Sequence, residues 1–398
     1  MALIRSYRPA ADHPSWVAAR ARLAASDTVI AQIDTGVFAH PSLGFTPASV
    51  PANIQIDRGL NVFDPDSSPF GQRPLTDLTT SGDPVSGLTE FPHHGIKTLG
   101  IVLSDSAAFQ GVAPGAKVVP YRAANGPVFR RSAADYSGNL HATARLGVAI
   151  EHAIALAPPP RVITLSMGNP GFVPWEFLRM LMGGSIGVAR SVAKAIDRAY
   201  LRGIPVVCAA GQMEHSVLFP AVMKRTIAVA GYEIGPSGLI HYPRGGYNNP
   251  GRVDTSALAV GLNRPGGHRD PLGAIVPTHA EDEHPPVKPE GTSFATPFVA
   301  AAYAMWFETF RGPLTAPDFS GRNAWRRVEA FRRILRQGMP TVMADSGQPG
   351  TADIAIRPLD IPRLLAAAPV AAGLEQQPPF RNLAFTNTDE DADYGPMV

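Results

Sequence analysis

The sequence predicts a three-layer α/β fold, in which a mainly parallel β-sheet is covered by helices on both faces. Short apolar segments typical of buried strands alternate along the chain with longer segments whose apolar residues recur at helical spacing. The chain has 398 residues, of which 45% are hydrophobic, so it has enough apolar side chains for a large core. One large α/β domain with loops and two smaller domains both fit this length.

The elements alternate in a consistent order. The first strand, residues 28–33, is apolar almost throughout, as expected for a central strand of a parallel sheet. Gly203 follows a helical segment and is suited to cap its C-terminus. The expected strands are 28–33, 117–121, 161–166, 204–210 and 226–230. The expected helices are 16–25, one that starts at or just before His94, 142–157, 189–201, one that follows Gly291 through Trp306, a basic amphipathic helix within 313–370, and a last helix after Asp360.

Composition argues against several classes of protein. The net charge is +2, and the Arg-rich run 322–336 is typical of one face of a helix, so we expect no nucleic-acid binding. No apolar run approaches the roughly 20 residues that a membrane helix needs. The N-terminal residues lack the apolar segment of a signal peptide, and the single cysteine, Cys208, excludes an internal disulfide. We therefore expect a cytoplasmic protein without a membrane partner.

Three polar residues follow or begin these elements. Asp34 comes directly after the first strand, where open α/β sheets place their sites. His94 lies at a helix start, and Ser293 begins an apolar helix whose positive dipole end favours an oxyanion. Each has an ordinary structural reading, as a turn residue before Gly36, an exposed histidine or a helix cap. Together they are the residue types of acyl transfer, in which a histidine moves the serine proton and an aspartate orients the imidazole.

The order Asp, His, Ser is the order known for subtilisin, and the chain resembles the subtilisin-like serine proteases, or subtilases. The resemblance spans about residues 28–309, and seven segments carry it in the family's order. The matching segments are 33–37 with His40-Pro41, His94-Gly95 with Gly100, 111–114, 162–168, 206–211, 219–221 and 291–297.

The resemblance implies a subtilisin-like fold and a serine endopeptidase that hydrolyses peptide bonds through a seryl acyl-enzyme. It implies that Asp34 is the orienting acid, His94 the general base and acid, and Ser293 the nucleophile. His93 does not fit, because the family places Gly directly after the catalytic histidine.

The resemblance also implies how a peptide or protein substrate binds. An extended peptide would pair with exposed backbone as an added strand. We expect a shallow apolar pocket for the residue before the cut. The substrate-binding residues implied are Ser166, Met167, Gly168, Ala210, Gly211 and Leu218.

The chain departs from the family at two positions. Gln212 stands where the family presents an asparagine amide to the oxyanion, so its longer side chain must be held by neighbours to point correctly. Ser42 stands where the family's common calcium site has an acid, and the segment 104–110 looks short, which leaves Asp105 as thin evidence for a hard-cation site. We expect no metal and no cofactor.

The expected domain organisation is an N-terminal extension (1–27), a catalytic domain (28–370) and an acidic, mobile tail (371–398). We expect the extension to be too short for a folded pro-domain. Its residues 3–9 are a candidate removable strap near the active site, which would resemble intracellular members of the family. The apolar insertion 172–188 is either a packed helix or a docking surface for a protein partner.

Two other functions remain open. Gln212 fits a catalytically weak or inactive subtilase that serves as a binding or regulatory module. The same acyl-enzyme also serves a peptide ligase or cyclase if water is excluded, and the insertion 172–188 is the candidate cover.

Overall fold

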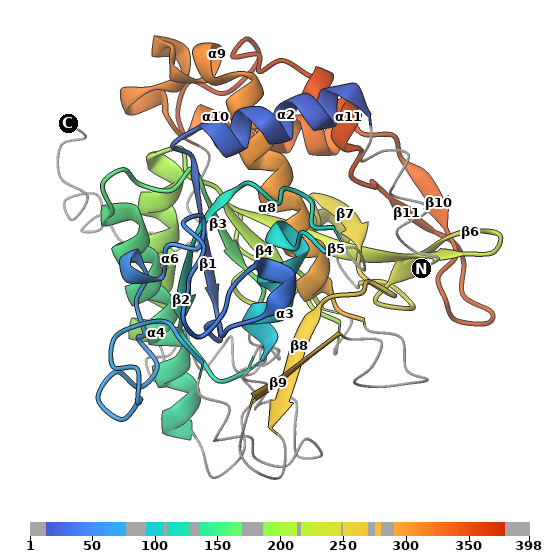
Figure 1. The fold of residues 1–398 in the computed structure, drawn as a ribbon. Coiled ribbons are helices and arrows are strands. Elements are labelled where there is room, and N and C mark those ends of the chain that lie inside the picture. The colour runs from blue at the N-terminus through green and yellow to red at the C-terminus, as the bar shows by residue number, and fades with distance from the viewer. Residues whose placement is uncertain are drawn as a thin grey trace.

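The predicted α/β class is confirmed by a computed structural model (Figure 1), which describes residues 13–76, 93–106, 110–126, 136–168, 186–212, 216–247, 250–269, 275–279 and 290–378. A seven-stranded sheet has the order β2-β1-β3-β4-β5-β6, and β7 also pairs with β5. All neighbours in it are parallel except β5 and β6, which form an antiparallel pair. The strands are β1 Val29–Asp34, β2 Lys117–Arg122, β3 Val162–Leu165, β4 Val206–Ala209, β5 Thr226–Gly235, β6 Gly238–Tyr242 and β7 Thr255–Leu258.

Helices cover both faces of the sheet (Figure 1). Side chains alternate along a strand, so neighbours in β1 belong to different cores. Ile30 packs with the helices α2, α3, α8, α10 and α11, whereas Val29 and Ala31 pack with α4 and α6. These helices are α2 Pro14–Ala25, α3 His94–Leu103, α4 Tyr136–Ala155, α6 Ile186–Leu201, α8 Thr292–Thr309, α10 Arg326–Arg333 and α11 Ile361–Ala366.

The helix α8 is the central helix of one layer. Its residues from Phe294 to Phe307 are all buried, as the apolar sequence on every side predicts. The helix starts at Thr292, so Pro297 lies inside it and not at its first turn, where proline is tolerated best. A proline here leaves the carbonyl of Ser293, four residues earlier, without its usual helical donor.

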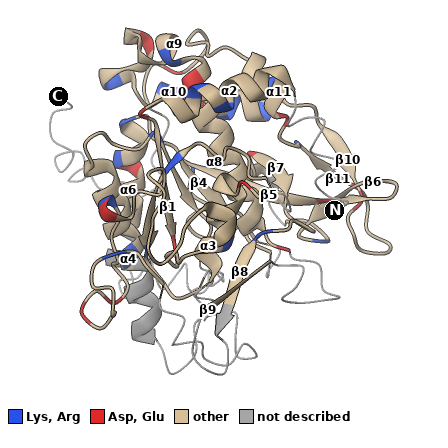
Figure 2. Ribbon diagram, viewed as in Figure 1, with Lys and Arg blue, Asp and Glu red and all other residues tan. Residues whose placement is uncertain are grey.

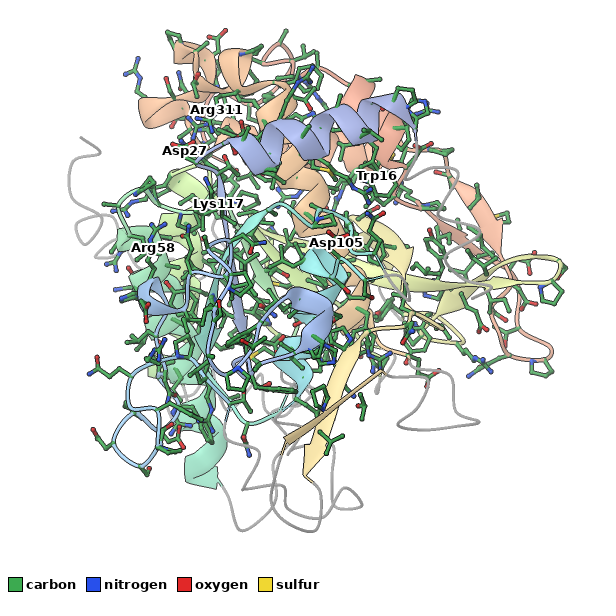
Figure 3. All side chains as sticks on the ribbon, viewed as in Figure 1. Trp16, Asp27, Arg58, Asp105, Lys117 and Arg311 are labelled. Carbon is green, nitrogen blue, oxygen red and sulfur yellow. The ribbon has the colours of Figure 1, made fainter. Side chains whose placement is uncertain are left out.

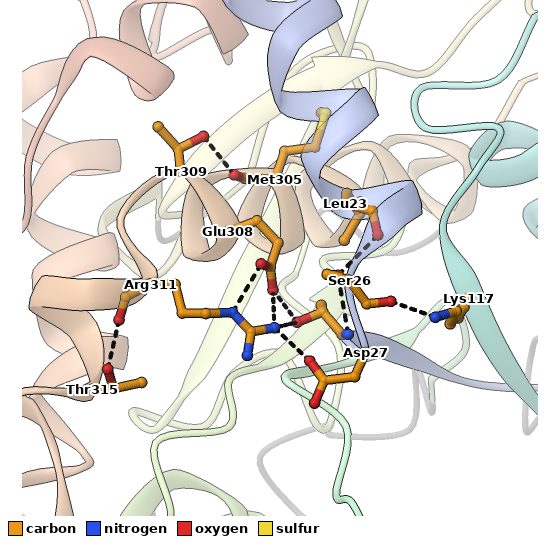
Figure 4. A network of polar contacts seen from close by, with 10 residues as sticks. Leu23, Ser26, Asp27, Lys117, Met305, Glu308, Thr309, Arg311 and Thr315 are labelled. Carbon is orange, nitrogen blue, oxygen red and sulfur yellow. Dashed lines mark hydrogen bonds and ion pairs between the residues drawn. The ribbon is translucent and has the colours of Figure 1, made fainter.

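The helix α2 belongs to the same layer and packs against α8 and α11. Trp16, labelled in Figure 3, is buried, and its indole N–H donates to the Val112 carbonyl at 3.1 Å. Figure 4 shows the polar contacts that follow this helix: the Arg311 guanidinium lies 2.6 Å from Asp27 and 2.7 Å from Glu308. These carboxylates raise the pKa of Arg311, and Glu308 also accepts from the Thr28 hydroxyl.

The chain beyond α8 adds the remaining elements. The predicted basic helix is α10, and Asp360 caps the predicted last helix, α11. Arg332 and Arg336 in the Arg-rich run pair with the buried Asp254, and Figure 2 shows basic and acidic residues interspersed over the helices in this view. The chain beyond α8 also forms the short helix α9 Arg311–Thr315 and an antiparallel pair, β10 Val342–Ala344 with β11 Ile354–Ile356. A second antiparallel pair, β8 Pro265–Arg269 with β9 Ile275–His279, precedes α8.

Some expectations fall on other parts of the chain. The candidate strap 3–9, residues 172–185 of the insertion and the tail from 379 lie outside the described residues. Within the described ranges, no helix is both long enough and apolar enough to cross a membrane.

Replacing Leu23 by Ala tests whether α2 contributes to the core. Leu23 is fully buried, so Leu23→Ala should lower the free energy of unfolding by about 2–5 kcal/mol. Val17→Ala on the same helix is the control: Val17 is 51% exposed, and its loss should cost no more than about 0.5 kcal/mol. Urea unfolding measures both free energies. If Leu23→Ala cost no more than Val17→Ala, the packing of α2 would contribute nothing measurable to stability.

Candidate active site

Asp34 and His94 meet at the carboxyl edge of the sheet. Asp34 is the last residue of β1, and His94 is the first residue of α3. His94 Nδ1 lies 2.7 Å from Asp34 Oδ1, and both side chains are almost completely buried. A carboxylate accepts only, so Nδ1 carries the proton in this pair, and Nε2 is the nitrogen that can act as a base.

The Asp34 carboxylate is fixed by further donors. Its Oδ1 accepts from the Thr35 N–H at 2.8 Å, and its Oδ2 accepts from the Thr98 hydroxyl at 2.9 Å. The Thr98 oxygen in turn accepts from the Gln32 amide at 2.6 Å. This chain of hydrogen bonds holds the carboxylate against the imidazole in one orientation.

The sequence interpretation missed Gln32 and Thr98, although both leave a signal. Gln32 is a polar residue in an otherwise apolar strand, and Thr98 lies four residues after His94, on the same face of the helix. A buried amide two residues before a strand-terminal Asp points to the same sheet face as that Asp.

Ser293 lies in the first turn of α8 and is joined to the residue after β3. The Ser293 hydroxyl donates to the Ser166 carbonyl at 2.9 Å, and the Ser166 hydroxyl donates to the Ser293 carbonyl, also at 2.9 Å. The second bond supplies the donor that Pro297 cannot supply. The two elements that carry Ser166 and Ser293 are therefore held in register by a reciprocal pair of bonds.

Phe294 connects the serine to the histidine. Its ring lies 6.0 Å from the His94 ring, centroid to centroid, at an angle of 35°. On the same ring the Arg264 guanidinium carbon lies 3.7 Å from the centroid, a cation–π contact of a buried arginine that the sequence did not predict. The residue after Ser293 is therefore in contact with the imidazole.

Gln212 is held by the residue that precedes Ser293. Its Oε1 accepts from the Thr292 N–H at 3.2 Å and from the Thr292 hydroxyl at 3.1 Å. A backbone N–H only donates, so Oε1 must face Thr292, and the amide Nε2 faces away. A Cβ placed on Gly291 would lie 3.7 Å from Nε2, so this donor lies beside the turn that leads into Ser293.

The residues expected to bind substrate lie around Leu218. A Cβ on Gly211 would lie 2.2 Å from the Leu218 Cγ, and a Cβ on Gly168 would lie 3.2 Å from its Cβ. Leu218 therefore fills the space between the two glycines, and its N–H donates to the Ala210 carbonyl at 2.9 Å. Met167 is 1% exposed, so its side chain belongs to the core.

The buried Cys208 side chain also belongs to the core, where burial raises the pKa of its thiol and favours the unreactive thiol form.

The segment considered for calcium is stabilised by hydrogen bonds of its own. The Ser42 carbonyl accepts from the Asp105 N–H at 3.0 Å, and the Ser42 hydroxyl lies 2.8 Å from His40 Nδ1. Within the described residues, no group of three or more His, Cys, Asp or Glu residues is placed to hold a metal ion. The absence of a calcium ion stays a prediction.

A mainly parallel sheet that brings an acid, a histidine and a serine-bearing helix to its carboxyl edge is typical of α/β serine hydrolases. The sequence model of the Subtilase family, a family of serine proteases, matches residues 25–321. The chain belongs to the subtilase family. No curated protein sequence matches it.

Solved structures share the fold. Fervidolysin from Fervidobacterium pennivorans, a keratinolytic enzyme related to subtilisin, has a TM-score of 0.55 and 19% identity over 89% of this chain and 44% of its own. A protease of Pseudoalteromonas arctica PAMC 21717 has a TM-score of 0.57 and 19% identity, covering 89% and 92% of the two chains. The prenylagaramide maturation protease PagA has a TM-score of 0.50 and 13% identity, covering 89% and 98%. The chain thus spans less than half the length of fervidolysin, and at these identities the likeness shows the fold alone.

Removing the Thr98 hydroxyl tests the support of the buried carboxylate. Thr98→Val leaves Asp34 Oδ2 without its 2.9 Å donor, so the free energy of unfolding should fall by about 1–3 kcal/mol. Thr296→Val is the control, because that equally buried hydroxyl donates to the Thr292 carbonyl of its own helix, and its loss should cost less than about 1 kcal/mol. Urea unfolding at neutral pH measures both, and a Thr98→Val variant as stable as the wild type would contradict this account.

Proposed function

We propose that the protein is a serine endopeptidase that hydrolyses peptide bonds through a seryl acyl-enzyme. The observation that carries the proposal is the 2.7 Å contact of buried Asp34 and His94, packed through Phe294 against α8, the helix whose first turn contains Ser293. Membership of the subtilase family supports a peptide or protein as the substrate.

The proposed mechanism starts with the Ser293 proton. The hydroxyl rotates from the Ser166 carbonyl to His94, and Nε2 takes the proton as the oxygen attacks the scissile carbonyl. The Asp34 carboxylate stabilises the imidazolium that forms. The imidazolium then protonates the leaving amine, and a water molecule, activated in the same way, releases the acyl group from Ser293.

Two donors are proposed for the tetrahedral oxyanion: the Ser293 N–H at the start of α8 and the Gln212 Nε2. The added methylene of glutamine makes its amide harder to orient, and the two Thr292 bonds to Oε1 restrict that freedom. These bonds support a working donor and count against the binding-module alternative. The ligase alternative depends on a cover within 172–188, most of which lies outside the described residues.

Leu218 suits a shallow primary pocket. Its side chain fills the space between Gly168 and Gly211, so the floor of the pocket is apolar and the pocket is shallow. We therefore propose a preference for a small apolar residue before the scissile bond.

A mixed peptide library, analysed by mass spectrometry, tests the activity. The wild type should cleave peptides, and Ser293→Ala should cleave none above background, because the nucleophile is gone. Joined peptides in the wild-type sample would favour the ligase. A wild type that is folded yet neither cleaves nor reacts with a fluorophosphonate would contradict the proposal and favour the binding module.

Substitution of Gln212 tests the oxyanion donor. Gln212→Ala should lower kcat by about 10²–10³ and leave KM nearly unchanged, because the bond strengthens only in the transition state. Gln212→Asn keeps an amide and should retain more activity than Gln212→Ala. Steady-state kinetics on one peptide measure all three proteins, and a Gln212→Ala variant with wild-type kcat would exclude the role.

Shortening Leu218 tests the pocket. Leu218→Ala removes the side chain between the two glycines, so cleavage after larger apolar residues such as Leu or Phe should rise about tenfold or more relative to Ala. Val217 is a neighbouring buried residue that packs in the core beneath α4 and α6, so Val217→Ala is the control and should leave the preference unchanged. An unaltered profile in Leu218→Ala would place the pocket elsewhere.

A further inference from the structure

A pocket apart from the candidate active site lies between the seven-stranded sheet and the hairpin formed by β10 and β11. It is lined by residues of β6 and β7, by the segments next to them, and by β11 with the residue that follows it, and it opens to solvent. The lining residues from β11 onward lie beyond residue 321, where the match to the subtilase family ends. This pocket is thus built partly from a segment outside the family match.

The hairpin that forms one wall is firmly attached. The His241 N–H donates to the Asp345 carbonyl at 2.7 Å, and the Asp345 N–H donates to the Leu239 carbonyl at 2.9 Å. On the other side of the pocket, the Ser256 N–H donates to the Arg357 carbonyl at 2.9 Å. Figure 1 shows β10 and β11 next to β6, at the end of the sheet away from α4 and α6.

Two side chains of the pocket keep unused polar atoms. His241 is 4% exposed, and among the described residues neither of its ring nitrogens has a hydrogen-bond partner. The Arg357 Nε is likewise buried with no partner in the described part of the chain. Burial lowers the pKa of His241 to about 4, so the ring is neutral at pH 7 and offers one donor and one acceptor. Unpaired buried donors are costly, and a ligand with oxygen acceptors would satisfy them.

The other polar groups of the pocket are already engaged. Asp254 accepts from Arg336 at 2.5 Å and from the Ala228 N–H at 2.8 Å, and Arg332 lies 3.4 Å from it. Arg332 also pairs with Glu329, so the charges of these two arginines are balanced by two carboxylates. Arg357 adds a further positive charge at the pocket, which favours an anion. Val253, Ile354 and Ile356 supply apolar walls.

We propose that this pocket binds a small carboxylate with a short apolar chain. Arg357 pairs with the carboxylate, His241 contributes its N–H, and the apolar chain lies against the aliphatic walls. A free short-chain acid and the C-terminus of an apolar peptide share this chemistry.

A contact path joins the pocket to the candidate active site. The Tyr247 ring lies 5.9 Å from the His241 ring, nearly perpendicular to it, and the Tyr247 hydroxyl donates to the Gly211 carbonyl. The Gly211 N–H donates to the Thr292 hydroxyl at 3.0 Å, and Thr292 holds Gln212. Occupation of the pocket therefore alters kcat more than KM, a consequence that rests on the proposed function.

Binding is tested by calorimetry on the full-length Ser293→Ala protein, in which catalysis plays no part. N-acetylleucine represents a peptide C-terminus, isovalerate a free acid, and N-acetylleucinamide the uncharged control. A carboxylate should bind with a Kd of about 1 mM or below, and the amide at least about tenfold more weakly. Binding of N-acetylleucine alone identifies a peptide C-terminus, and equal binding of both acids identifies the free acid.

Two variants locate the site. Arg357→Gln and His241→Leu should each weaken carboxylate binding about tenfold or more, whereas Arg322→Gln, an exposed arginine outside the pocket, should not. A melting temperature for each variant shows that it is folded. No binding of either acid at about 20 mM, equal binding of the amide, or unchanged binding in folded Arg357→Gln would overturn the proposal.

The effect on catalysis is measured separately on the wild type. N-acetylleucine at saturation should change kcat at constant KM, and Arg357→Gln should abolish the change. Carboxylate binding in a protein that has no peptidase activity would refute the proposed function and leave the binding site intact. A protein that cleaves peptides but binds no carboxylate would refute the proposed binding site and leave the proposed function intact.

Discussion

The reciprocal hydrogen bonds between Ser166 and Ser293 are the constraint on which the site depends. They join the end of β3 to the start of α8, elements more than 120 residues apart in the chain. The bond to the Ser293 carbonyl exists because Pro297 removes the helical donor for it, so a residue usually unfavourable inside a helix leaves that acceptor open for a side chain of the neighbouring loop. The bonds to Ser166 fix the orientation of α8 about its own axis. In this orientation Thr292 contacts Gln212, and Phe294 contacts His94.

Each polar residue of the site is held through a neighbour that does no chemistry itself. Thr98 and Gln32 fix the carboxylate of Asp34, Thr292 fixes the amide of Gln212, and Arg264 packs on the ring that lies against His94. All of these supporting residues are buried or nearly so, where hydrogen bonds and cation–π contacts are less screened by water. The geometry is consequently set by the rigid layers of the fold and not by the surface loops.

The sequence was sufficient for the parallel strands β1 to β5, because each of them contains a run of apolar residues. It did not predict β6 to β11, which have only three to five residues each, so that neither length nor alternation distinguishes them from loops. Asp34, His94 and Ser293 were found because each stands at the end of a recognisable element. Arg264, Thr98 and Gln32 were missed, because what they do is visible only once distant segments are packed together.

The order of the elements along the chain has a consequence for synthesis. β1 is made early, yet the helix that covers its face and carries Ser293 is made more than 250 residues later. During translation the part of this face that α8 covers in the finished fold therefore stays exposed after α2 and α3 are made, and exposed apolar surface of this kind favours association. The same delay keeps Ser293 apart from His94 until α8 has been made, so the candidate site is assembled late in synthesis.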